Sequence, residues 1–163
     1  MRWLENEAHG KHLFYWMSGC LVFKLLYAPA AVVAMFFLGI TISPVPGFER
    51  FPELTPILFI SFFGAAGLEE MLFRLPLAIF VWLRFSIANI LVIAVGLSAF
   101  FGILHGGTTH ILVQGVNGFA LSLLFLKCGG CQGHEAKALL TTTTVHFLFN
   151  MTLLLSGIAI AAA

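Results

Sequence analysis

The feature that most constrains this chain is a group of charged residues inside a long apolar run. The run extends from Leu54 to Leu83 and contains Glu69, Glu70 and Arg74. A charged side chain at bilayer depth costs about 2.5–3.5 kcal/mol on insertion scales. Charges placed there are therefore expected to face the interior of a helical bundle or a cavity, where they pair or serve a function.

The spacing of these charges separates a structural carboxylate from a free one. Glu70 and Arg74 are four residues apart, so on a helix they share a face and are expected to pair. Glu69 points about 100° away from Glu70 and has no equally good partner nearby in the sequence. We therefore expect Glu70 to be structural and Glu69 to face a cavity.

The composition indicates an integral membrane protein. Of the 163 residues, 60% are hydrophobic and only 9% are charged, with a mean hydropathy of +1.02. A soluble domain has about a quarter of its residues charged. The net charge of +1 gives no reason to expect nucleic acid as a partner. We expect an all-α fold, a polytopic bundle of transmembrane helices, in one domain over residues 1–163.

Apolar stretches of about 20 residues, the length that crosses a bilayer, predict about five to six spans. Residues 1–17 are polar and aromatic and are expected to lie at the membrane interface. A proline-rich loop, Ser43–Gly47, precedes the motif-bearing core at residues 54–163, and Lys127–Lys137 is predicted to be a loop. The five clearest spans are Cys20–Ile42, Thr55–Trp82, Ile87–Leu104, Ile111–Leu126 and Ala138–Ala161.

The distribution of basic residues predicts the orientation. Lys and Arg favour the cytoplasmic side of short loops. A cytoplasmic N-terminus leaves only Arg50 on the outer side and places the other basic residues of the predicted spans and loops inside. These are Arg2, Lys11, Lys24, Arg84, Lys127 and Lys137.

Further polar residues lie in or at the ends of the predicted spans. His105 ends the third span, and His146 and Asn150 share a helical face in the fifth. Their most favourable arrangement is around a wet cavity together with Glu69. A carboxylate beside an imidazole is a suitable base for activating water. A second imidazole and a carboxamide can donate hydrogen bonds to an oxyanion, so the set suffices to hydrolyse a peptide bond.

Three short motifs follow one another on the second, third and fifth predicted spans: Glu69-Glu70-x-x-x-Arg74, Phe101-x-x-x-His105 and His146-x-x-x-Asn150. In this order they resemble the CAAX-protease and bacteriocin-processing family of intramembrane proteases, also called Abi. That family includes prenyl-protein endopeptidases of the Ras-converting-enzyme type. The resemblance covers Leu54 to the end of the chain, and it implies an intramembrane peptidase.

The resemblance also implies a role for each motif residue. Glu69 activates the attacking water together with His105, and His146 and Asn150 stabilise the oxyanion. The residues expected to support the site structurally are Glu70 and Arg74.

A metal-dependent form of the same chemistry stays open. One glutamate and two histidines are possible zinc ligands, namely Glu69, His105 and His146. Asn150 is a poor zinc ligand but a good oxyanion donor, which favours a metal-free mechanism. We therefore expect no cofactor and keep zinc as the alternative.

The short chain resembles small bacterial members of the family, including myxosortase-like enzymes. This implies a prokaryotic cell membrane and a membrane-anchored protein or peptide as substrate, such as a C-terminal sorting tail or a prenylated or bacteriocin-like precursor. The non-enzymatic alternatives are an immunity factor and a transporter. A transporter is expected to show repeated halves, and the sequence contains no such repeat.

Other chemical patterns are weaker. Ser98 lacks the following glycine expected of a serine intramembrane protease and leaves Glu69 unexplained. His134-Glu135 is followed by Ala138 where a zinc protease would have its second histidine. The sequence Cys128-x-x-Cys131-x-x-His134 is interpreted as a turn rather than a metal or redox site.

Overall fold

The structure is a computed structural model that describes the chain except for residues 1–3, 5, 42–55 and 162–163, and that leaves out the side chains of residues 56–62 and 157–161. The described residues form helices and no strand, which confirms the all-α class. The predicted loop Ser43–Gly47 lies outside the described residues. The helices are α2 (Gly10–Phe37), α3 (Pro56–Trp82), α4 (Ile87–Leu104), α5 (Gln114–Phe125) and α6 (Glu135–Ala161), with a 3-10 turn, η1 (Thr108–Ile111), and a π-helical turn, η2 (Leu126–Gly130).

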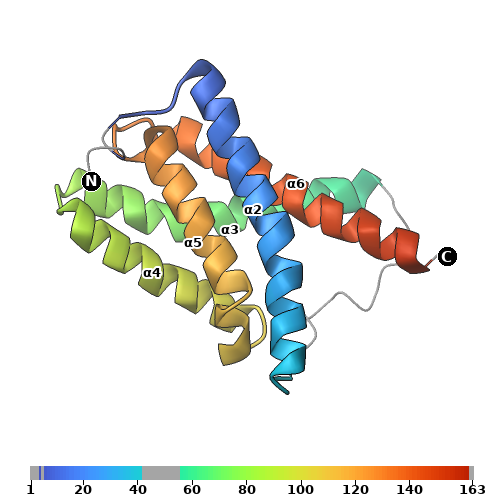
Figure 1. Ribbon diagram of the computed structural model, residues 1–163. Coiled ribbons are helices and arrows are strands. Elements are labelled where there is room, and N and C mark those ends of the chain that lie inside the picture. The colour runs from blue at the N-terminus through green and yellow to red at the C-terminus, as the bar shows by residue number, and fades with distance from the viewer. Residues whose placement is uncertain (1–3, 5, 42–55, 162–163) are drawn as a thin grey trace.

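The helices cross one another rather than forming a parallel bundle. In Figure 1, α2 and α5 lie side by side and run in opposite directions, while α3 and α6 cross them. Helix α6 contacts α2, α3 and α5, and α4 packs against α5 and α3. As a result, the middle of α3 is surrounded by segments from α4, α5 and α6.

Four helical segments among the described residues are long and apolar enough to cross a membrane. Helix α3 is 27 residues long, but it carries Glu69, Glu70 and Arg74 within six positions and is not one of the four. Large apolar side chains such as Phe37 and Val92 are exposed on the outer faces of the bundle, as expected for contact with lipid. The four segments are Gly10–Phe37, Ile87–Leu104, Thr108–Gly130 and Glu135–Ser156.

The first span begins earlier than predicted. Helix α2 starts at Gly10 rather than at Cys20, so residues 10–17 are continuous with the first span. The position of residues 1–17 at the membrane interface stays a prediction. The reason is packing, because Leu13 and Met17 lie one turn apart and contact the cluster around Leu121 and Val145. The predicted third span matches α4 at both ends.

The fourth span and the loop after it also differ from the prediction. A 3-10 turn precedes α5, which begins only at Gln114. The residues Lys127–Gly130, predicted to start a loop, lie instead in the buried π-helical turn η2, in which the backbone of Cys128 and Gly129 departs from helical geometry. Glycine is required at the end of this turn, because a Cβ at Gly130 would lie 2.5 Å from the Phe125 ring.

A polar cluster fastens the segment before α2 to the start of α6. We call it the end cluster and define it as Glu7, His9, His134 and Lys137. Glu7 accepts hydrogen bonds from Lys137 Nζ at 2.5 Å and His134 Nδ1 at 2.6 Å, and His9 Nε2 lies 3.6 Å from its carboxylate. The hydrogen bond from Lys137 holds the pKa of Glu7 below its usual value.

Candidate active site

Glu70 and Arg74 form a buried ion pair one helical turn apart on α3. Arg74 Nε donates to Glu70 Oε2 at 2.8 Å, and Nη2 donates to Oε1 at 3.3 Å. Both side chains are almost completely shielded from solvent. The pairing follows from the spacing of the two residues, and the two-pronged geometry is the strong form of an arginine–carboxylate contact.

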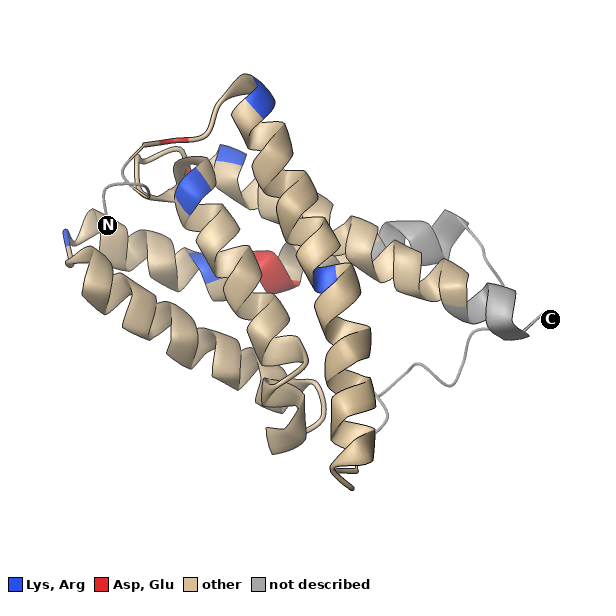
Figure 2. Cartoon of the chain, viewed as in Figure 1, with Lys and Arg blue, Asp and Glu red and all other residues tan. Residues whose placement is uncertain are grey.

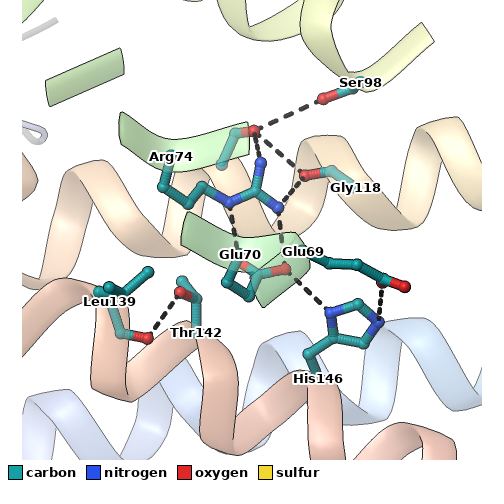
Figure 3. Close-up of polar contacts among 9 residues, drawn as sticks. Glu69, Glu70, Arg74, Ser98, Gly118, Leu139, Thr142 and His146 are labelled. Carbon is teal, nitrogen blue, oxygen red and sulfur yellow. Dashed lines mark hydrogen bonds and ion pairs between the residues drawn. The ribbon is translucent and has the colours of Figure 1, made fainter. Parts of the chain in front are cut away.

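The guanidinium of Arg74 is also held by α5, as Figure 3 shows for Gly118. Nη1 donates to Ser122 Oγ at 2.8 Å, and Nη2 donates to the Gly118 carbonyl at 3.1 Å. Ser98 on α4 reaches the same hydroxyl, with its Oγ 3.5 Å from that of Ser122. These contacts fix α3 against α4 and α5, and they account for Ser98 as a structural residue.

Glu70 binds His146 as well as Arg74. His146 Nδ1 lies 2.9 Å from Glu70 Oε1, and both side chains are buried (Figure 3). The ionised carboxylate only accepts, so Nδ1 carries the proton and donates. Sequence spacing predicted the contact between Glu70 and Arg74, but it gave no signal for this second partner, which is 76 residues away.

Glu69 lies between two imidazoles. Its Oε1 is 3.8 Å from His105 Nε2, and its Oε2 is 3.7 Å from His146 Nε2. Its side chain is 33% exposed, in contrast to that of Glu70. Both distances exceed a direct hydrogen bond, and the partial exposure of Glu69 makes a bridging water possible.

Phe101 positions His105 in two ways. Its carbonyl oxygen lies 2.8 Å from His105 Nδ1, and its ring centre lies 4.1 Å from that of the imidazole. The ring also approaches His146, at 6.1 Å between centres. Close packing against α5 is possible because residue 118 is glycine; a Cβ there would lie 3.1 Å from Phe101 Cδ1. In the sequence, Phe101 is identified only as part of a motif.

The three central residues come together without a break in any helix. Straight parallel spans would place Glu69, His105 and His146 at different depths, by roughly a dozen ångströms at 1.5 Å per residue. Helix α3 is nevertheless continuous through Gly64 and Gly67. The crossing of the helices (Figure 1) brings the residues together instead.

Asn150 lies one turn beyond His146 on α6 and is partly buried. The hydrogen bonds and ion pairs of the cluster, as far as the structure describes them, do not include its amide. Its role as an oxyanion donor therefore stays a prediction.

The donor types at the site suit zinc, because both histidines present Nε2 towards a carboxylate. Among the described residues, no group of three or more His, Cys or Glu side chains is placed to hold a metal ion. Cys20 packs against the hydrophobic cluster that contains Cys128, and Cys131 packs against the cluster that contains Leu126.

Lys24 is a buried charge for which the sequence predicted only a position on the cytoplasmic side. It lies in the middle of α2, with its Nζ 4.4 Å from the centre of the Phe149 ring. Figure 2 shows this basic segment of α2 beside the acidic segment of α3 at the centre of the molecule.

An apolar groove of about 600 Å³ lies between α2 and α5. Neither Glu69 nor the two histidines around it line this groove.

Comparison with known proteins adds a family to this geometry. The model of a family described as type II CAAX prenyl endopeptidase Rce1-like matches residues 51–152. The matched range contains all three motifs and most of α3, α4, α5 and α6, but not α2. No curated protein and no solved structure matches the chain.

Proposed function

The chain belongs to the Rce1-like family of type II CAAX prenyl endopeptidases, and we propose that it cleaves membrane-anchored substrates with a water activated by Glu69 and His105. The family consists of intramembrane proteases, and the four apolar helices agree with an integral membrane protein. The observation that carries the proposed chemistry is the position of the Glu69 carboxylate between two histidine Nε2 atoms.

His105 is oriented as a proton acceptor. The Phe101 carbonyl can only accept a hydrogen bond, so His105 Nδ1 carries the proton in the neutral ring and Nε2 presents its lone pair to Glu69. A water between the two groups donates one hydrogen bond to each. Its oxygen attacks the scissile carbonyl carbon as its proton passes to the Glu69 carboxylate.

His146 is placed to stabilise the oxyanion. Its Nδ1–H is held by Glu70, whose own charge is held by Arg74. The Glu70 carboxylate stabilises a positive charge on this ring, as in other carboxylate–histidine pairs, and we propose that His146 acts in its doubly protonated form. The imidazolium Nε2–H then donates to the developing oxyanion, with the Asn150 amide as the second donor.

Collapse of the tetrahedral intermediate breaks the C–N bond. The proton that Glu69 received from the water passes to the leaving nitrogen, so the products are a carboxylic acid and an amine. The acid then gives its remaining proton to the amine or to solvent. Glu69 returns to its ionised form, and no other co-reactant is needed.

The substrate we propose is a membrane-anchored protein or peptide, such as a prenylated protein, a C-terminal sorting tail or a bacteriocin-like precursor. We place the N-terminus in the cytoplasm of a prokaryotic cell. The support is that Lys127 and Lys137 both bind the segment before α2, Lys127 at the Asn6 carbonyl and Lys137 at the Glu7 carboxylate.

The test is cleavage of lipid-anchored peptides by purified protein, with Glu69→Gln against wild type and Glu135→Gln as a matched control at the start of α6. We expect Glu69→Gln to lower kcat/KM by about 10²–10⁴ and Glu135→Gln to leave it unchanged. Activity that survives a strong chelator supports the metal-free route. Activity lost to the chelator and restored by zinc would instead make ligands of Glu69, His105 and His146. Cleavage indifferent to Glu69 would refute the site.

A further inference from the structure

Lys24 is an ionisable group near the active site that the proposed mechanism does not use. Its side chain is 1% exposed, and among the residues that the structure describes it forms no ion pair. Burial of an ammonium without a paired carboxylate is costly. An ionisable residue at membrane depth that faces the bundle interior is therefore a candidate for function.

Asn117 on α5 is a second buried polar group with unused hydrogen-bonding capacity. It is 1% exposed, and neither Oδ1 nor Nδ2 has a hydrogen-bond partner within the described part of the chain. Leaving such a group unsatisfied costs about 1–3 kcal/mol. The amide offers one acceptor and two donors, which is the complement of a peptide group.

Lys24 and Asn117 lie at the same level of two neighbouring helices. Helices α2 and α5 are antiparallel and side by side (Figure 1), and Tyr27 Oη donates to the Leu112 carbonyl at 2.6 Å. Along the sequence, Lys24 lies midway between Cys20 and Ala28, and Asn117 lies midway between Val113 and Leu121. Cys20 packs against the hydrophobic cluster that contains Leu121, and Ala28 and Val113 belong to one other cluster.

This level of the molecule is also that of the catalytic cluster. The carbonyl of Gly118, the residue after Asn117, binds Arg74. The Lys24 ammonium is close enough to Glu70 and Glu69 to interact with both electrostatically. Phe149, which the ammonium faces, is three residues from His146 on α6.

We propose that Lys24 and Asn117 form a subsite that binds the peptide main chain of the substrate next to the scissile bond. The inference rests on the proposed function. The Asn117 amide pairs with a main-chain N–H and C=O, and the Lys24 ammonium binds a neighbouring oxygen from a carbonyl or a terminal carboxylate. A helical peptide has these groups bonded internally, so the substrate is extended where it meets this subsite.

The test is a binding measurement on the full-length protein in a Glu69→Gln background, where no peptide is cleaved. The probes are two fluorescent lipid-anchored peptides of the same apolar sequence, one ending in a carboxylate and one in a carboxamide. We expect Lys24→Met to weaken binding roughly tenfold to a hundredfold and Asn117→Leu roughly tenfold. Loss of binding to the carboxylate peptide alone identifies a terminal carboxylate as the ligand of Lys24, and equal loss for both peptides identifies a carbonyl.

Matched controls are Lys11→Met, at an exposed lysine on the same helix, and Asn89→Leu, at an exposed asparagine on α4. Both controls should bind like the parent. Unfolding midpoints are measured for every variant, with Lys24→Gln used if Lys24→Met does not fold. Unchanged binding in the Lys24 and Asn117 variants would overturn the inference, as would the absence of binding by the parent. Because binding is read without catalysis, a failure of the Glu69 mechanism shows separately in the cleavage assay.

Discussion

Glu70 at the centre of the molecule and Glu7 at its end are both buried glutamates bound by a cation and by imidazole, but their partners differ in exposure. Arg74 and His146, the partners of Glu70, are nearly as buried as Glu70 itself. The partners of Glu7 reach solvent, with Lys137 34% exposed and His134 58% exposed. Glu70 and its partners are all enclosed among the helices, whereas the partners of Glu7 are in contact with solvent.

The difference separates the two tasks of polar groups in this protein. In the central cluster the charges have no water to replace a lost partner, so each member depends on the others. In the end cluster, solvent screens the charges and replaces a missing contact. The first arrangement suits an oriented site, and the second fastens the segment before α2 to α6.

Replacement of Arg74 should therefore give the largest loss of stability. Arg74→Leu leaves the Glu70 carboxylate buried without its cation, which is expected to destabilise the protein by about 3–5 kcal/mol. Reversible unfolding by SDS in mixed micelles measures the change. A loss below about 1 kcal/mol would mean that water reaches Glu70, and the contrast between the two clusters would disappear.

The next largest loss of stability is expected from replacing Gly102, a glycine on α4 close to His105. A Cβ on Gly102 would lie 2.6 Å from Ile111 Cα and 2.8 Å from the His110 carbonyl, so α4 would have to move away from η1. We expect Gly102→Ala to cost about 1–3 kcal/mol and to lower activity, because His105 follows three residues later. Gly96→Ala on the same helix meets no atom within 4 Å and is the control, expected to be neutral or slightly stabilising.

The sequence predicted those parts of the site that depend on local spacing. The contact between Glu70 and Arg74 follows from a separation of four residues, and the boundaries of α4 follow from an apolar run between Ser86 and His105. That the three motifs lie close together could be predicted because polar groups in apolar spans avoid lipid and face one another. Each of these rests on a rule that acts within one helix or on burial alone.

The rest depends on contacts between residues that are far apart in the chain. The hydrogen bond of His146 to Glu70 and the approach of Lys24 to the same carboxylate depend on how α2, α3 and α6 cross. The end cluster joins Glu7 to Lys137, 130 residues apart. The start of α2 at Gly10 was missed for the same reason, since its first turns are stabilised by packing against α5 and α6.

Removal of the cation from the end cluster should have a much smaller effect than removal of Arg74. Lys137→Met is expected to cost about 1 kcal/mol or less, because the pair is partly exposed. The cost should shrink further at high salt, where exposed charges are screened, whereas the cost of Arg74→Leu should not. Unfolding at low and high ionic strength compares the two variants. A salt-independent loss of several kcal/mol in Lys137→Met would show that the end cluster is sealed like the central one.

The smallest expected effect is a dependence of the end cluster on acid pH. The hydrogen bond from Lys137 holds the pKa of Glu7 below 4.5, its value in the unfolded chain. The stabilisation is therefore complete above pH 4.5 and is lost as the pH falls below 4.5 through the folded pKa, because protonation of Glu7 removes its charge. Hydrogen exchange at the Ala8 amide, which donates to the Lys127 carbonyl at 3.0 Å, reports on this docking once corrected for the intrinsic rate. Protection should decrease below pH 4.5 in the wild type and change less in Lys137→Met. The same pH profile in both proteins would mean that Lys137 is not the cause of the lowered pKa of Glu7.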